Sequence, residues 1–271
     1  MRGLLGAATT VALVPLVLIL YYLFKKGLGA WGGSFFTSDP NGSFLGDPGG
    51  IRSAILGTIE IVALATLIAV PIGVLVALYL VEFGRGKTFA NVVRYFVDVL
   101  TGVPSIVFGL FVYIVLVTST LFGVGYAGWK GAVALALLML PVVVRSAEVV
   151  LLLVPDSLRE AALALGSPRW RVALRIVLPA AVPGLLTGSL LAIARAAGET
   201  APLLFTSAYV LGTSFNLDGR VNSLPLQIFQ DVGQAQDRLV TRAWGAALTL
   251  VALILLLTLI ARLFQRRMRT P

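Results

Sequence analysis

Two charged residues, Arg195 and Glu199, interrupt a long apolar stretch of this 271-residue chain. Residues four apart lie on one face of an α-helix, so the two side chains can meet. An ionisable side chain in the middle of a membrane span costs about 2.5 to 3.5 kcal/mol on insertion scales, and such residues usually mark a pathway through the protein. We therefore predict that Arg195 and Glu199, together with Thr200, line a pathway. A structural ion pair that locks two helices together is the alternative.

The residues around this pair predict a helix that packs closely and then breaks. Gly184 and Gly188 form a G-x-x-x-G step, which allows close helix contact or leaves room for a passage. Both interpretations place the charged pair in the interior of the bundle. Gly198 and Pro202 bracket the pair, and a helix can break at such residues.

A second candidate site is the segment of residues 155–179, which predicts two short helices joined by a turn. Pro155 ends the preceding helix, and Ser157 with Glu160 forms a capping box that opens a new one. Gly166 is the residue type preferred just past a helix end. The serine and proline that follow it are then the cap and the first position of the second helix.

The second short helix is basic and amphipathic. Helical spacing places an apolar set on one face: Trp170, Ala173, Leu174 and Val177. Arg171 and Arg175 share another face. The pattern fits an interfacial helix that lies on lipid, and it equally fits a helix that docks on another protein. Ala161 and Ala162 favour docking, because small side chains let another surface approach closely, whereas a lipid anchor would present larger ones.

Composition excludes most enzyme chemistry. The chain has no histidine and no cysteine, so the usual zinc ligands, thiol nucleophiles and histidine acid-base catalysts are missing. Residues 84–88, GRGKT, lack the first glycine of a phosphate-binding loop, since Val81 stands there, and we interpret them as the charged flank of a membrane helix. We attribute the net charge of +9 to lysines and arginines in cytoplasmic loops, which set the orientation of a membrane protein. No metal site and no nucleic-acid partner is expected.

The elements that must position these residues are membrane helices. Hydrophobic residues make up 58% of the chain, charged residues 12%, and the mean hydropathy is +0.97. We predict an all-α, polytopic membrane protein with about six transmembrane helices. The candidate spans are residues 7–24, 55–81, 95–118, 131–146, 180–198 and 243–263, and residues 200–212 form a broken or re-entrant piece.

Basic residues predict the orientation and the division of the chain. With both termini in the cytoplasm, more lysines and arginines fall in inner than in outer segments, and the run RLFQRRMRT is the strongest cluster. Lys25 and Lys26 argue against this orientation. The predicted domains are residues 1–54, a helix with an outer loop; 55–265, the transmembrane domain with its cytoplasmic loop 155–179; and 266–271, a cytoplasmic basic tail.

Other charged residues in or near the predicted spans receive simpler interpretations. Arg145 and Glu148, three apart, predict an ion pair at a cytoplasmic helix extension. Asp98 is expected to cap a helix or to pair near the start of the third span, and Glu60 is assigned no role.

The segment 155–179 resembles a known family. It matches the pattern E-A-A, three residues, G, nine residues, I, one residue, L-P, at Glu160, Ala161, Ala162, Gly166, Ile176, Leu178 and Pro179. This is similar to the EAA signature of permease subunits in ATP-binding-cassette importers. The resemblance implies the MetI-like architecture of type I importers. It also implies that these residues, with Arg169 and Arg171, form a coupling loop that docks in a groove of a cytosolic ATPase.

Two further stretches narrow the resemblance. FVDVLTGVPSIVFGLF at 96–111 and RAAGETAPLLFTS at 195–207 resemble the PstA-type permeases of phosphate-specific importers. This resemblance implies import of inorganic phosphate across a bacterial or archaeal cytoplasmic membrane. Arg195 would then contact phosphate, since a guanidinium suits it through paired hydrogen bonds, and Glu199 with Thr200 would tune that contact so that the anion is released.

The resemblance also implies partners. These are a related PstC-type permease, two copies of a PstB-type ATPase that holds ATP and magnesium, and an extracytoplasmic PstS-type phosphate-binding protein. No cofactor is expected on this chain, which is expected to be a transport subunit and not an enzyme. A permease for another oxyanion, such as sulfate or molybdate, is the nearest alternative. A secondary transporter driven by an ion gradient is a more distant alternative. That class would be expected to have two inverted halves, and none is evident in the sequence.

Overall fold

The computed structural model describes residues 2–43 and 46–268, with side chains described for 6–43 and 46–263. These residues form helices and no strand, which confirms the all-α prediction. The elements are α1 (Arg2–Gly27), η1 (Leu28–Ala30), α2 (Arg52–Leu78), η2 (Tyr79–Phe83), α3 (Thr88–Gly102), α4 (Ser105–Val112), η3 (Tyr113–Val117), η4 (Thr120–Phe122), α5 (Gly128–Leu152), α6 (Asp156–Ala164), α7 (Arg169–Val172), η5 (Ala173–Val177), α8 (Leu178–Ala197), α9 (Ala201–Thr206), α10 (Leu224–Val232) and α11 (Asp237–Met268). Residues 269–271 of the predicted tail lie outside the described part, and the domain boundaries stay a prediction.

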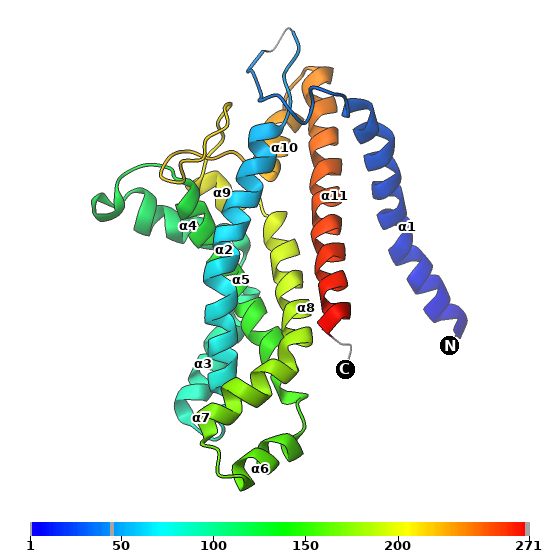
Figure 1. The fold of residues 1–271 in the computed structure, drawn as a ribbon. Helices are drawn as coiled ribbons and strands as arrows, with labels where there is room; N and C mark the ends of the chain where they lie inside the picture. The colour runs from blue at the N-terminus through cyan, green and yellow to red at the C-terminus, as the bar shows by residue number, and fades with distance from the viewer. Residues whose placement is uncertain (1, 44–45, 269–271) are drawn as a thin grey trace.

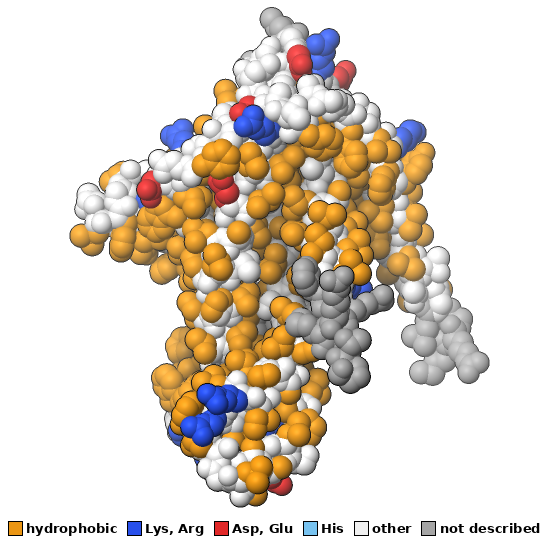
Figure 2. All heavy atoms as spheres, viewed as in Figure 1, with side chains coloured by type: hydrophobic (Ala, Val, Ile, Leu, Met, Phe, Trp, Pro, Cys, Tyr) orange, Lys and Arg blue, Asp and Glu red, His pale blue; other side chains and the backbone are white. Residues whose placement is uncertain are grey.

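The described helices give the predicted number of spans. Five are long and apolar enough to cross a membrane: Gly6–Ala30, Arg52–Phe83, Gly128–Leu152, Arg169–Ala197 and Asp237–Leu263. A bent pair, Thr88–Gly102 with Ser105–Val117, makes a sixth if it counts as one span. Apolar side chains cover the flanks of the helices, and charged side chains gather toward the ends of the molecule (Figure 2). The chain is therefore a multi-pass membrane protein, as predicted.

The third predicted span, 95–118, is not one straight helix. It divides between α3 and α4, which meet at an angle of 104°. Val103 and Pro104 at the break have extended backbones, with ψ of 129° and 139°. Proline disfavours helical geometry in the residue before it, so the sequence T-G-V-P forces the bend that hydropathy alone does not reveal.

Helices α2, α5 and α8 form the centre of the bundle (Figure 1). Ile61 of α2 and Leu135 of α5 are fully buried in one apolar cluster. Gly184 and Gly188 of α8 both face α5, where a Cβ on Gly188 would lie 2.6 Å from the hydroxyl oxygen of Ser146. The G-x-x-x-G step therefore serves close helix packing, the first of its two predicted uses.

The two ends of the bundle differ in construction. The elbow, residues 155–179 with α6 and α7, lies at one end, which we call the elbow end (Figure 1). Residues 28–51, α9 and α10 lie toward the opposite end, which we call the loop end. The N-terminal end of α1 and the C-terminal end of α11 both point toward the elbow end. Helix α1 stands apart from the bundle and contacts mainly α11 and η1.

Candidate functional site

The elbow consists of a short helix, a glycine turn and the start of a long helix. Gly166 has φ +78°, a conformation that glycine adopts without strain. Its N–H donates to the carbonyl of Leu163 at 2.9 Å, and the N–H of Ser167 donates to the carbonyl of Ala162 at 3.2 Å, the pattern that closes many helix ends. The predicted role of Gly166 is confirmed.

The predicted helix starts are displaced. Pro155 and not Ser157 is the N-cap of α6, with no side-chain cap, so the expected capping box does not form. A helix can begin directly after proline because proline already has a helical φ and needs no hydrogen bond there. Likewise Pro168 is the N-cap of α7, and Arg169 is its first residue.

The second elbow helix is continuous with the span that follows it. The helical run extends from Arg169 to Ala197, whereas the sequence predicted a separate helix before residue 180. A proline in a helix crowds the carbonyl four residues earlier and donates no hydrogen bond. Here the π turn η5 ends just before Pro179, and the N–H of Leu178 bonds the carbonyl of Ala173. This wider turn carries the helix past the proline without a break.

The second elbow helix buries only part of its predicted apolar face. Ala173 and Val177 are buried, but Trp170 is 51% and Leu174 44% exposed, so the predicted apolar face divides. Of the nine residues predicted to dock an ATPase, Ala162 is buried, and Ile176 and Leu178 are half-buried against the elbow core. The exposed members are Glu160, Ala161, Gly166, Arg169, Arg171 and Pro179.

Arg159 anchors the elbow, a role that no sequence motif predicted. Its side chain is 7% exposed, and its guanidinium bonds Glu82 Oε1 at 3.0 Å, Asp156 Oδ1 at 3.0 Å and the Leu151 carbonyl at 2.9 Å. It also donates to the carbonyl of Val154. Because these partners come from η2, α5 and α6, the arginine ties the elbow to the ends of two spans. The basic residue directly before the E-A-A pattern was its only sequence signal.

The pair Arg195 and Glu199 lies at the surface of the single chain. The two side chains are 55% and 18% exposed, and Arg195 Nε is 3.8 Å from Glu199 Oε1, too far for a hydrogen bond. The predicted interior position is therefore wrong for Arg195 in the single chain, because Ala192 and Ala196 take the buried positions of that last turn of α8, whereas Glu199 is half-buried. Thr200 is half-buried beside the pair.

The predicted helix break after the pair is present. Helix α8 ends at Ala197, and the short helix α9 begins at Ala201. Pro202 of α9 is buried against α4, where a Cβ on Gly109 would lie 2.7 Å from the Pro202 Cα. The break therefore leaves Arg195 at the end of a long helix, next to a separately packed piece.

A second charged cluster joins α3 to α5. The predicted pair forms, with Arg145 Nη1 2.7 Å from Glu148 Oε2. Asp98 accepts from Arg145 Nε at 2.7 Å, which confirms one of its two predicted uses. Arg94, which the sequence analysis did not assign, bonds Glu148 Oε1 at 2.6 Å. This network stabilises the α3–α5 contact.

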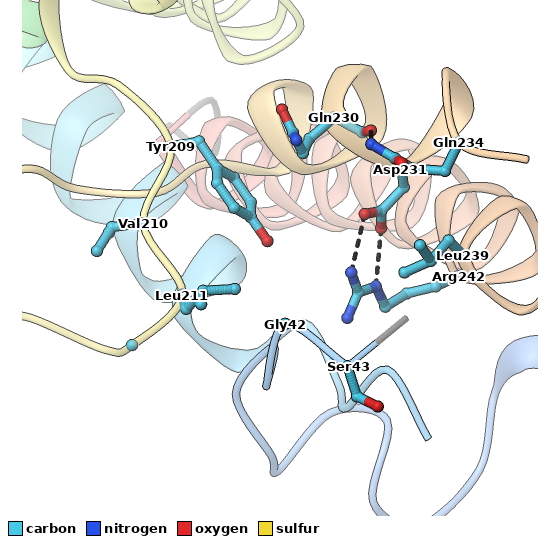
Figure 3. Close-up of a pocket in the computed structure, with 11 residues that line it drawn as sticks. Gly42, Ser43, Tyr209, Val210, Leu211, Gln230, Asp231, Gln234, Leu239 and Arg242 are labelled. Atoms are coloured by element: carbon cyan, nitrogen blue, oxygen red, sulfur yellow. Dashed lines mark hydrogen bonds and ion pairs between the residues drawn. The ribbon is translucent and has the colours of Figure 1, made fainter. Parts of the chain in front are cut away.

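The loop end contains a buried ion pair beside a cavity of about 490 Å³ (Figure 3). Arg242 and Asp231 are 4% and 1% exposed and share two hydrogen bonds of 2.8 Å. Gln227 donates to Asp231 Oδ2 at 2.9 Å, and Arg242 also donates to the carbonyl of Pro48. Tyr209 lines the same cavity, and burial raises the pKa of its hydroxyl. No spacing rule could reveal this pair, since its members lie on different helices.

These features define a class: a polytopic helical membrane protein with a cross-linked elbow between two of its central spans. Residues 69–270 match the family of the binding-protein-dependent transport system inner membrane component. The chain belongs to this family, which makes it a membrane component of a transport system.

Named relatives and solved structures agree with this assignment. The chain is 42% identical over 267 residues to the phosphate transport system permease protein PstA of Haemophilus influenzae, covering 97% of this chain and 92% of the relative. It is 43% identical to PstA of Yersinia pestis, covering 91% and 82%. A chain of the MetNI methionine ABC transporter has a TM-score of 0.66 at 20% identity, covering 79% of this chain and 94% of that one. A chain of a bacterial alginate ABC transporter has a TM-score of 0.68 at 17% identity, covering 98% and 96%. The fold predicted from the EAA resemblance is confirmed.

Proposed function

We propose that the chain is the permease subunit of an ATP-binding-cassette importer that moves inorganic phosphate into the cell. The observation that carries this proposal is 42% identity over 97% of the chain to a protein named for phosphate transport. The matched region covers 97% of this chain, so it includes both the elbow and the helix that carries Arg195. ATP and magnesium bind a partner ATPase and not this chain.

The elbow receives the ATPase. Glu160 and Ala161 are exposed on the face of α6 opposite buried Arg159 and Ala162, and the small side chain of Ala161 leaves that face open to a partner. Arg159 fixes the other face to the spans, so force on α6 passes into the bundle and not into a loose loop. The elbow end is accordingly cytoplasmic, and so are both termini.

One helix connects the docking elbow to the substrate pathway. The run Arg169–Ala197 contains 29 residues, which at 1.5 Å per residue gives a contour length of about 43 Å. Arg169 begins it at the elbow, and Arg195 stands in its last turn. The helical run is unbroken between the two residues, so a tilt imposed at the elbow can be passed along it toward the guanidinium.

Arg195 binds phosphate during transit. Its exposure in the single chain suits a pathway shared with a second, PstC-type permease that covers this face. A guanidinium gives paired hydrogen bonds to phosphate, and Glu199 nearby offers the empty site a neutralising partner. Because the two charges are 3.8 Å apart and not locked by a hydrogen bond, phosphate can separate them at small cost. A PstS-type protein delivers phosphate at the loop end.

The test is ATP-driven uptake of labelled phosphate by proteoliposomes that hold the assembled transporter. We expect Arg195→Gln to reduce uptake at least about tenfold, since it removes a charged contact to the anion, while the subunits still assemble. Arg175→Gln removes an exposed arginine of the same helical run, outside the proposed docking residues, and serves as the matched control, with uptake near normal. Full uptake by Arg195→Gln contradicts the proposed site.

Stronger competition by sulfate or molybdate than by phosphate contradicts the substrate, and uptake without ATP contradicts the transporter class.

A further inference from the structure

A second basic site lies behind the elbow, separate from Arg195. A cavity of about 430 Å³ opens between α6, α7, η2 and the loop that follows η2. Its cationic lining residues are Arg85, Lys87, Arg159 and Arg169. Its floor is apolar and includes Val81, Phe83 and Val172. Figure 2 shows basic side chains gathered at the elbow end, where Figure 1 places α7.

The positive charge of this cavity is only partly neutralised. Glu82 is the one carboxylate among the described residues that line it, and its Oε1 accepts from Arg159 at 3.0 Å. Asp156 nearby is shared between Arg159 at 3.0 Å and Arg85 at 3.6 Å. Lys87 and Arg169 are exposed, and the described residues form no ion pair with either. Two cations from different segments therefore face one cavity without a fixed counter-ion.

The cavity and the docking face lie on opposite sides of α6. Arg159 and Leu163, four apart, share the side that lines the cavity. Glu160 and Ala161 are turned by about 100° and 200° from Arg159 on an ideal helix, toward the exposed side. A partner seated on Glu160 and Ala161 therefore leaves the cavity to a small ligand.

We propose that this cavity binds a phosphate group and that the bound group ties the elbow to the loop that follows η2. An arginine fork and a lysine are the residues that suit phosphate oxygens, the first through paired hydrogen bonds and the second as a point charge. The lining comes from both segments, so an occupied site resists separation of the elbow from residues 84–87. This inference rests on the proposed function, in which the elbow couples the ATPase to the spans. A bound phosphate group then reduces coupling, because it restrains movement of the elbow. The source is free inorganic phosphate or the headgroup of an anionic lipid, which share this chemistry.

Trp170 provides a local probe of the site. It follows Arg169 directly and is 51% exposed, whereas Trp31, Trp129 and Trp244 lie near the loop end. The experiment titrates inorganic phosphate into the purified full chain in neutral-lipid nanodiscs at constant ionic strength and follows tryptophan emission. We expect a saturating change that Trp170→Phe removes and that an equal concentration of chloride does not produce.

Variants locate the response. Lys87→Gln is expected to weaken phosphate binding several-fold, and Lys87→Gln/Arg169→Gln at least about tenfold, because charged hydrogen bonds to the anion are lost. Arg175→Gln, an exposed arginine of the same helix outside the lining, is the matched control and is expected to bind as the parent chain does. Arg195→Gln is also expected to retain the response, which separates this site from the transport pathway.

Two lipid compositions distinguish the sources. If the phosphate response disappears in nanodiscs that contain phosphatidylglycerol, the lipid headgroup occupies the site; if it persists, free phosphate does. Either result supports the proposal. A response that is absent in both lipids, or equal in the double variant, overturns it. So does a response lost in Arg195→Gln, which would place phosphate in the pathway alone, or a double variant that loses only ATPase association.

Discussion

Arg159 at the elbow end and Arg242 at the loop end are both buried arginines, yet their partners differ in exposure. Arg242 bonds Asp231, whose side chain is 2% exposed, and it also donates to the carbonyl of Pro48. Arg159 divides its bonds between Glu82 at 12% exposure and Asp156 at 65%. The loop end is therefore held by an ion pair whose two side chains are both buried, whereas the buried arginine of the elbow shares its charge with a carboxylate that is largely exposed. This contrast suits a bundle with one stationary end and one end that moves.

The largest expected effect is at the loop end. Arg242→Met leaves Asp231 buried without its partner, and we expect it to lower the free energy of unfolding by about 3 to 5 kcal/mol. Denaturation of the purified chain in mixed micelles measures it. Arg242→Met/Asp231→Leu removes both charges and is expected to recover most of the loss. A single variant that loses less than about 1 kcal/mol would refute the contrast between the ends.

A smaller loss is expected at the elbow. Arg159→Met should lower the free energy of unfolding by about 1 to 3 kcal/mol, because Asp156 regains water while Glu82 and two carbonyls lose a donor. Arg175→Gln, exposed on the same side of the bundle, should stay within about 0.5 kcal/mol of the parent in the same denaturation assay. If Arg159→Met costs more than Arg242→Met, the elbow is the rigid end and the comparison is reversed.

The elbow turn itself is the next test. Gly166→Ala forces a Cβ into a backbone with φ +78°, which costs roughly 1 to 2 kcal/mol. Gly166→Asn should cost less, since asparagine tolerates this conformation. Gly212→Ala is the matched control, because a Cβ there meets open space and its φ is not positive. Equal stability of all three variants would show that the elbow turn relaxes without cost.

The smallest effect is a pH dependence at the loop end. Burial raises the pKa of Tyr209 above its usual value of 10.0, so the folded chain holds this proton more tightly than the unfolded chain. The stability it contributes is complete below about pH 10 and is lost as pH rises through the folded-state pKa. Tyr209→Phe should flatten this alkaline decline in thermal stability. An unchanged decline would mean that the hydroxyl is not a buried part of the loop-end cavity.

Hydropathy and spacing predicted much of this structure from sequence. Five spans, the turn at Gly166 and the Arg145–Glu148 pair follow from patterns within one segment, where neighbours along the chain decide the outcome. The bend at Pro104 and the unbroken helix through Pro179 depend on how each proline is accommodated.

Burial and pairing between segments could not be predicted in the same way. Arg242 and Asp231 pair because α10 and α11 pack together, and no periodicity in either helix requires it. Arg195 is exposed because none of the described residues covers the last turn of α8 on that side, which hydropathy does not report. The sequence therefore identified residues such as Arg195 by their chemical type, but it did not predict which side chains surround them or how exposed they are.

Co-purification of the ATPase subunit with Ala161→Trp tests most directly whether the elbow is the coupling surface. The variant places a large side chain on the exposed face of α6 without touching the cavity or the anchor Arg159. Val149→Trp, exposed on α5, controls for adding the same bulk elsewhere. We expect Ala161→Trp to fold normally but to lose the ATPase, and with it ATP-driven phosphate uptake, while Val149→Trp keeps both. Retention of the ATPase and of uptake by Ala161→Trp would contradict the account.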